Sequence, residues 1–378
     1  MKVKNRRDLL RNIFTCCLAV LVLGGGIFYF SGAYDSWRDK VSLDSACQGT
    51  LDQPSLQEAL SSKRAHAGNF YEDRTGSLTR CAITTSGNNS STLRLDVRWG
   101  SDADRDSGLV GRADMLGLIG RSSPLGGDWP GAISFNEPQA TVALPCRNRK
   151  NESLLVDSRL SSPHLVTSLF PSHRLGQSRI RAAFVRFTTE TAMHAADKFG
   201  CEASEGKAIK EAPTDPLNLD GSRVIAKSAQ PLANTDGTCA PLRPLASAAA
   251  KAGVPKGMES PSQKNAPLTD CFLTTPDGEP GYGLSATYGA YAKIFREAGG
   301  PSNVHGKSGF PEKRNYAWAT ARCPGSTERA LFTLWQVYDT AREETPVKKR
   351  SHKFELSALK AFAKHSTQQH GCSDLQLP

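Results

Sequence analysis

The chain has 378 residues, enough for two or three domains, and an apolar fraction of 38% that is ordinary for a protein with a buried core. Its formal net charge is +10. Seven Lys or Arg and three Asp among residues 1–40 account for +4, which leaves +6 for the rest of the chain. This mild excess over a long stretch does not indicate a nucleic-acid-binding protein.

The ten cysteines are too many for routine use in the cytosol. Two of them, Cys16 and Cys17, lie in an apolar N-terminal segment, and the other eight follow it. An even number of cysteines beyond such a segment predicts disulfides in an oxidising compartment. Zinc is the alternative, but no two of the eight have the C-x2-4-C spacing that is typical of zinc sites.

The N-terminal segment, residues 13–32, contains twenty residues without a charge. That length predicts a transmembrane helix, since about twenty apolar residues cross a ~30 Å hydrocarbon core. Five Lys or Arg precede it in residues 1–12, which favours a cytoplasmic tail and an extracytoplasmic main portion. We interpret the segment as an uncleaved anchor. The alternative is a signal peptide cleaved at the small residues 31–33.

An internal repeat follows the apolar segment, with copies at residues 41–205 and 236–378. Each copy begins with a cysteine and a proline, Pro54 or Pro244, where a helix could start. A second cysteine then begins a hairpin in which apolar residues alternate with other residues, as Leu93, Leu95 and Val97 do in the first copy. Such alternation predicts a half-buried antiparallel strand.

The second half of each copy repeats in the same way. The third cysteine follows a strand-like stretch, and an apolar run comes next. A closing helix then runs into Gly-Cys, at residues 190–201 and 361–372. Gly200 and Gly371 stand where a helix would end in a left-handed residue, which glycine adopts without strain. Residues 206–235 between the copies are rich in small, polar and proline residues and are interpreted as a linker.

These observations predict an α+β protein. We expect an N-terminal transmembrane helix and two tandem disulfide-stapled repeats, each a small antiparallel sheet with two helices on one face. Two like units of four cysteines allow three pairing patterns, and we favour the first with the second and the third with the fourth. The predicted bonds are Cys47–Cys81, Cys146–Cys201, Cys239–Cys271 and Cys323–Cys372.

The chain resembles uncharacterised exported, membrane-anchored proteins of actinobacteria in three features. These are the N-terminal anchor, the helix that starts after the first cysteine, and the closing helix that ends in Gly-Cys. The resemblance implies a location at the cell membrane, with the N-terminus in the cytoplasm and the bulk outside. It implies no activity.

Motifs of catalysis and metal binding are weak. Ser357 and Lys360 match the S-x-x-K motif of penicillin-binding enzymes, but the other motifs of those enzymes are missing or out of order. Residues 102–106 read D-x-D-x-D, yet the glycine and glutamate of a calcium loop are absent from the positions that follow. His194 and His365 occupy matching positions without a second ligand. We therefore predict no catalytic residue, no metal site and no cofactor.

One basic cluster, Lys348, Lys349, Arg350 and Lys353, is interpreted first as a solvated loop that leads into a helix, and the alternative is contact with an anionic partner. The predicted function is that of an extracytoplasmic binding or interaction module. Its partners would be the membrane, through the N-terminal helix, and an envelope polymer or protein, with a cleft between the copies as the natural place for a ligand. The alternatives are a hydrolase-type enzyme with a site between the repeats and a structural component of the envelope.

Overall fold

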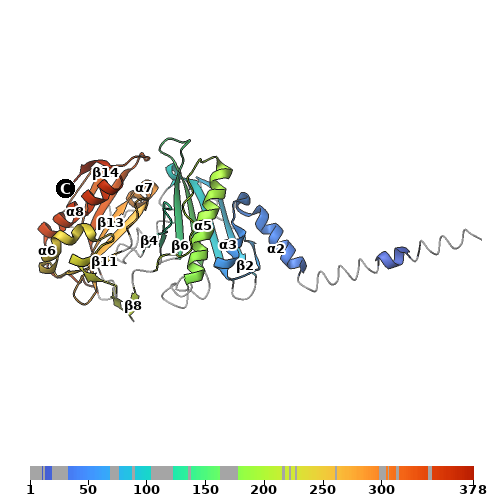
Figure 1. The fold of residues 1–378 in the computed structure, drawn as a ribbon, viewed down its shortest axis with the longest axis horizontal. Coiled ribbons are helices and arrows are strands. Elements are labelled where there is room, and N and C mark those ends of the chain that lie inside the picture. Colours follow the sequence, from blue (N-terminus) through green and yellow to red (C-terminus); the bar gives the residue numbers. More distant parts are fainter. Residues whose placement is uncertain are drawn as a thin grey trace, which may run out of the picture.

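The computed structural model describes two units, residues 33–214 and 228–378, each built around an antiparallel sheet of seven strands (Figure 1). The described residues are 11, 13–18, 33–68, 76–86, 90–103, 122–134, 138–161, 178–214, 218–220, 223–225, 228–259, 262–297, 304, 306–311, 315–338 and 343–378. A separate two-stranded ribbon, β8 (Asn218–Asp220) and β9 (Arg223–Ile225), lies between the units in the chain.

The first sheet has the strand order β1-β2-β3-β7-β6-β5-β4. Its strands are β1 (Ala65–Gly68), β2 (Ser77–Thr85), β3 (Thr92–Trp99), β4 (Ser122–Pro124), β5 (Gly131–Ser134), β6 (Gln139–Pro145) and β7 (Ser153–Ser161). Leu93, Leu95 and Val97 of β3 are buried in one core cluster, which confirms the predicted alternation.

The second sheet has the order β10-β11-β12-β13-β15-β14-β16. Its strands are β10 (Gln230–Pro231), β11 (Lys256–Glu259), β12 (Leu268–Thr274), β13 (Pro280–Thr287), β14 (Tyr316–Arg322), β15 (Arg329–Gln336) and β16 (Ser373–Gln376). Strands β11-β12-β13-β15-β14 repeat the order of β1-β2-β3-β7-β6 in the first unit. The second cysteines also match, because Cys81 lies opposite Leu95 and Cys271 opposite Leu284.

An opening and a closing helix cover the same face of each sheet, as the sequence predicts. In the first unit these are α3 (Gln53–Leu60) and α5 (Ser178–Phe199), and in the second α6 (Ala246–Lys251) and α8 (His352–Gln369). Pro54 lies in the first turn of α3, where the missing N–H costs nothing, and the Asp52 side chain caps that turn by accepting from the Ser55 amide. Gly200 and Gly371 have φ of 70° and 63°, which confirms the left-handed helix ends.

Further helical segments lie outside this repeated plan. They are α2 (Ala33–Ser45), α7 (Ala290–Glu297) and the 3-10 helices η1 (Ala46–Gly49), η2 (Gly100–Asp102), η5 (Leu232–Asn234) and η6 (Ala240–Leu245). Pro244 lies inside η6, two residues before α6 begins. The start of the predicted linker packs on the first unit, where Ile209 and Ala212 are buried and the Trp129 indole donates to the Lys207 carbonyl.

The four disulfides join the pairs that the cysteine order predicts. Their Cα–Cα distances are 5.4 Å for Cys47–Cys81, 4.9 Å for Cys146–Cys201, 5.1 Å for Cys239–Cys271 and 4.0 Å for Cys323–Cys372. No bond joins the two units. Each unit therefore has its own two disulfides, and the pairing of the cysteines is the same in both copies of the repeat.

The predicted fold class is wrong in two respects. No helix among the described residues is long and apolar enough to cross a membrane. Of the predicted span, residues 13–18 are helical, and residues 19–32 lie outside the described part of the chain. The sheets are also larger than predicted. Their added edge strands have only two to four residues, too few to show an alternating pattern.

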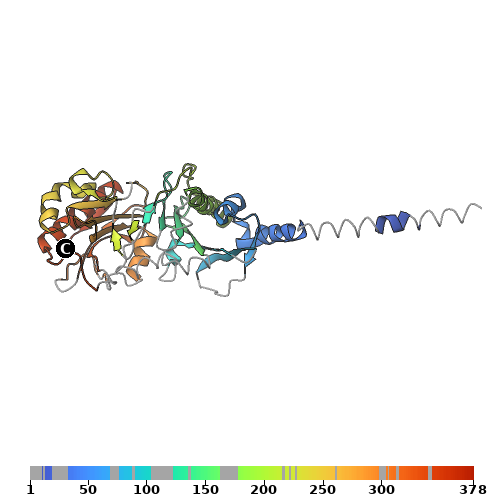
Figure 2. The ribbon, with the colours of Figure 1, turned by 90° about the horizontal axis from the view of Figure 1, so that it is seen from below.

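The helix-free faces of the two sheets are turned toward each other, so the helices of the repeated plan lie on the outside and α7 lies between the sheets (Figures 1 and 2). One cluster of buried apolar residues spans both units and includes Leu155 of β7 and Ile294 of α7. Polar contacts cross here as well: the Ser122 hydroxyl donates to Asp270 at 2.7 Å, and the Tyr291 hydroxyl donates to the Thr141 carbonyl at 3.3 Å. These contacts place loops of both units around a shared pocket.

Candidate functional site

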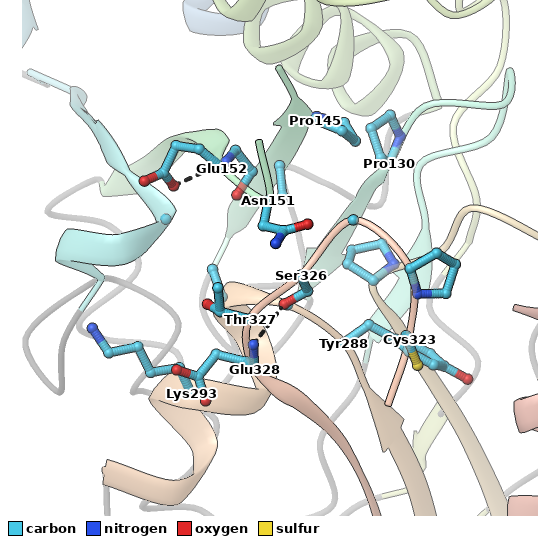
Figure 3. A pocket seen from close by; sticks show the side chains of 18 of the residues that line it. Pro130, Pro145, Asn151, Glu152, Tyr288, Lys293, Cys323, Ser326, Thr327 and Glu328 are labelled. Atoms are coloured by element: carbon cyan, nitrogen blue, oxygen red, sulfur yellow. Dashed lines mark hydrogen bonds between the residues drawn. The ribbon is translucent and has the colours of Figure 1, made fainter. Parts of the chain in front are cut away.

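A pocket of about 390 Å³ lies between the units (Figure 3). Two segments of the first unit line it: the turn between β6 and β7, and the residues that follow β3. The second unit contributes the turn between β14 and β15, the residues that follow β13, residues 265–267 before β12, and His370. The hairpin turn and the residues after the preceding strand are equivalent places in the repeat, so both copies present these two loops to the pocket.

Glycine fits the points where the chain leaves β3 and β13 better than a residue with a side chain would. A Cβ at Gly100 would lie 2.4 Å from the Ser153 hydroxyl oxygen, closer than real Cβ contacts allow. Gly289 has φ of +54°, which strains any L side chain. The aromatic-Gly pair that recurs in the sequence, Trp99-Gly100 and Tyr288-Gly289, is therefore a structural signature of the pocket wall.

The aromatic ring before each glycine is covered by a basic or ionisable side chain. The Arg149 guanidinium lies 4.0 Å from the centroid of the Trp99 ring. His370 stacks on Tyr288 with ring centroids 3.7 Å apart, and the Tyr288 hydroxyl donates to the Ser366 carbonyl at 3.4 Å. Burial raises the pKa of Tyr288, so its hydroxyl remains a donor. One face of each ring is therefore covered by a side chain of its own unit.

His370 is occupied by backbone contacts. Its Nδ1 lies 3.2 Å from the Ser366 carbonyl oxygen, and its Nε2 lies 3.2 Å from that of Ala266. Burial lowers the pKa of His370, while the two carbonyl contacts act in the opposite direction. Because each ring nitrogen faces a carbonyl, the imidazole anchors the end of α8 and offers no nitrogen to a substrate as a general base.

The two carboxylates of the pocket also hold their own loops. Glu152 and Glu328 are equivalent, since each is the last residue of its hairpin turn. Glu152 Oε1 accepts from the amides of Ser101, at 3.1 Å, and Ser153, at 2.9 Å. Glu328 Oε2 lies 3.4 Å from Arg296 Nη1. Both carboxylates are thus engaged by groups of the protein itself.

Four polar side chains of the pocket remain available to a ligand. They are exposed and make no hydrogen bond or ion pair to any part of the chain that the structure describes: Lys150, Asn151, Asn265 and Thr327. Asn151 lies in the hairpin turn with φ of 59°, a left-handed conformation that asparagine tolerates better than most residues. Two of the four come from each unit. No motif in the sequence marks any of them, although each of Lys150, Asn151 and Thr327 follows the third cysteine of its copy within five residues.

The predicted anionic-partner cluster lies elsewhere and is partly committed to the fold. Lys348 pairs with Glu344. Arg350 binds the fully buried Glu355, with Nε–Oε1 of 2.9 Å and Nη2–Oε2 of 2.6 Å. The hydrogen bond to Glu355 raises the pKa of Arg350. Lys349 and Lys353 remain exposed, so of the four residues these two are the ones whose charge is available to an anionic partner.

The weaker candidates from the sequence do not assemble a site. The Ser357 hydroxyl donates to the Lys353 carbonyl on its own helix, and His194 Nδ1 lies 3.3 Å from the Thr50 carbonyl oxygen. Asp104 and Asp106 lie outside the described residues. Within the part of the chain that the structure describes, no group of three or more His, Cys, Asp or Glu residues is arranged to hold a metal ion.

Comparison with known proteins gives no match: no family model, no curated protein and no solved structure is similar to this chain. The resemblance to exported proteins of actinobacteria remains a prediction. The function must therefore be argued from the pocket and its residues.

Proposed function

We propose that this protein binds a small polar ligand in the pocket between its two units. The observation that carries the proposal is the set of four uncommitted polar side chains on a wall that both copies build. A volume of about 390 Å³ lies in the range of ligand sites. The surrounding wall is held by its own hydrogen bonds, which reduces the conformational entropy that the protein would lose on binding a ligand.

The uncommitted groups indicate the class of ligand. The carboxamides of Asn151 and Asn265 each donate and accept hydrogen bonds, which suits an amide on the ligand. The Lys150 ammonium is the one charge on the wall that lacks a partner among the described residues, and it suits a carboxylate. The proposed ligand therefore carries amide groups and a carboxylate. An N-acylated sugar acid and the C-terminus of a peptide both have this chemistry.

Binding accounts for the pocket better than hydrolysis does. Hydrolysis needs an activated nucleophile or a pair of carboxylates free to exchange protons. Here Glu152, Glu328 and His370 are all held by groups of the protein itself. A wall whose carboxylates and imidazole are engaged, and whose side-chain amides and one ammonium are available, suits recognition of a ligand better than its hydrolysis.

The four disulfides favour an oxidising compartment outside the cytoplasm as the place of action. There the ligand would be a segment of an envelope polymer or the end of an exported peptide. Contact of Lys349 and Lys353 with an anionic stretch of the same partner is a further part of this proposal, supported by the exposure of both side chains.

Calorimetric titration with matched probes tests the proposal. N-acetylmuramic acid is compared with N-acetylglucosamine, which lacks its carboxylate, and N-acetyl-alanyl-alanine is compared with its C-terminal amide. We expect the acid of at least one pair to bind more tightly than its neutral partner. The substitution Lys150→Ala should weaken that acid about tenfold and leave the neutral probe unchanged, because a charge-assisted hydrogen bond contributes about 1.5 kcal/mol or more.

Controls separate the pocket from the rest of the surface. Asn265→Ala should weaken both members of the pair, since it removes the contact to the amide. Lys251→Ala, at an exposed lysine that does not line the pocket, should change neither. Absence of binding by all four probes, or binding that Lys150→Ala and Asn265→Ala leave intact, would disprove this assignment.

A further inference from the structure

One disulfide differs from the other three in its exposure. The paired cysteines are 5% and 9% exposed in Cys47–Cys81, 6% and 4% in Cys146–Cys201, and 0% in both residues of Cys239–Cys271. Both cysteines of Cys323–Cys372 are only partly buried. Cys323 also lines the pocket (Figure 3).

The difference has a local cause that the repeat makes visible. Cys146–Cys201 is the equivalent bond of the first unit, and there the chain after Cys201 folds back over the hairpin turn. The Arg147 amide donates to the Glu202 carbonyl at 2.8 Å, and the Glu202 amide donates to the Asn148 side chain at 3.0 Å. In the second unit the chain after Cys372 enters β16 and pairs along β14 instead. Both cysteines of this bond are less buried than Cys146 and Cys201, and Cys323 lines the pocket.

We propose that Cys323–Cys372 is a site of thiol exchange with a low-molecular-weight thiol that enters through the pocket. The thiolate attacks Cys323 Sγ, and the bond between Cys323 and Cys372 breaks. The electron pair passes to Cys372 Sγ, which takes a proton from water. The product is a mixed disulfide on Cys323 and a free thiol at Cys372. Attack by a second thiol on the sulfur of the bound thiol releases the oxidised small-molecule disulfide and leaves Cys323 reduced.

The surrounding contacts allow this exchange without unfolding. Arg329 holds β16 next to the bond, with Nη1 2.7 Å from Asp374 Oδ2 and Nη2 2.7 Å from the Asp374 carbonyl oxygen. The helix before Cys372 is anchored independently, since Phe354 and Phe362 of α8 are buried in the core. Reduction of Cys323–Cys372 should therefore leave β16 paired in the second sheet and α8 packed on that sheet.

The test uses the native full-length chain with glutathione as the thiol. Cys16 and Cys17 carry free, exposed thiols, so they are first blocked with N-ethylmaleimide. After timed exposure to glutathione, new thiols are alkylated with iodoacetamide, and each cysteine peptide is quantified by mass spectrometry. We expect glutathione on Cys323 and alkylation on Cys372, at a rate at least about tenfold above that of Cys146–Cys201, because accessibility governs exchange.

Circular dichroism of the same samples shows whether the exchange occurs in the folded protein or only after unfolding. The expected spectrum after exchange is that of the folded protein. Equal rates for Cys323–Cys372 and Cys146–Cys201 would overturn the proposal, and so would opening of the bond only together with loss of the folded spectrum. Glutathione found on Cys372 in place of Cys323 would overturn the assignment of Cys323 as the attacked residue.

Discussion

At the scale of the residue, the role of a charge depends on what it contacts. Sequence alone groups Arg350 with Lys348, Lys349 and Lys353 as one exposed basic cluster. The structure separates them, because Arg350 neutralises the fully buried carboxylate of Glu355, which also accepts from the Tyr282 hydroxyl at 3.0 Å. A charge reversal at Arg350 would thus disturb the fold. A test of anionic partners should reverse only Lys349 and Lys353.

The substitution Arg350→Ala should lower the free energy of unfolding by about 3 kcal/mol, since it leaves the Glu355 carboxylate buried without its cation. Lys349→Ala, one residue earlier and exposed, is the matched control and should change stability by about 0.5 kcal/mol or less. Urea denaturation measures both. An Arg350→Ala variant as stable as the Lys349→Ala variant would show that the ion pair contributes little.

At the scale of the element, the repeat is clearest where local chemistry sets the structure. Both closing helices end in a glycine with positive φ, and the cysteine of the next position then bonds back to the third cysteine. The same helix end thus fixes the direction in which the chain reaches the disulfide. The edge strands obey no such local rule, and they differ between the units.

Replacement of the glycine at a helix end tests this account. A Cβ at Gly371 would meet no atom within 4 Å, so the expected cost of Gly371→Ala is conformational only. It should destabilise the protein by about 1 kcal/mol, because an L residue is strained at φ of 63°. Gly371→Asn should cost less, since asparagine tolerates the left-handed region. Thermal denaturation of the two variants checks the order, and equal losses would argue against backbone strain as the cause.

At the scale of the whole molecule, the two copies act as one body joined by their helix-free faces. Helix α7 lies between the sheets, with Phe295 in an apolar cluster of the second unit and Ile294 in the cluster that spans both. The pocket exists only because the units meet, since each contributes half of its loops. Loosening this interface should therefore affect the first unit as well as the second.

Ile294→Ala should cost about 3 kcal/mol, the typical penalty for a buried Ile-to-Ala cavity. It should also speed amide hydrogen exchange in β6 and β7 of the first unit, which lose their packing partner. Phe362→Ala is the control, because its side chain lies in the core between α8 and the second sheet. Exchange in β6 and β7 that is no faster in Ile294→Ala than in Phe362→Ala would mean that the units are stabilised independently.

Much of the frame of this protein follows from the sequence by itself. The order of the cysteines, the alternation in β3 and β13, and the glycines after the closing helices predict the repeat, its disulfides and the face that the helices cover. These features depend on patterns within about ten residues or on the like order of two copies. Local backbone preferences and the period of apolar residues determine them before the units meet.

Only the tertiary structure decides which side chains share the pocket, which cation neutralises Glu355 and which disulfide is exposed. Lys150 and Asn265 meet across the pocket although 115 positions separate them in the chain, and no local pattern marks either one. Cys146–Cys201 and Cys323–Cys372 occupy equivalent places in the repeat, yet the path of the chain after the last cysteine covers one and leaves the other open. Such properties depend on which segments pack together, and packing is settled by contacts between distant parts of the chain.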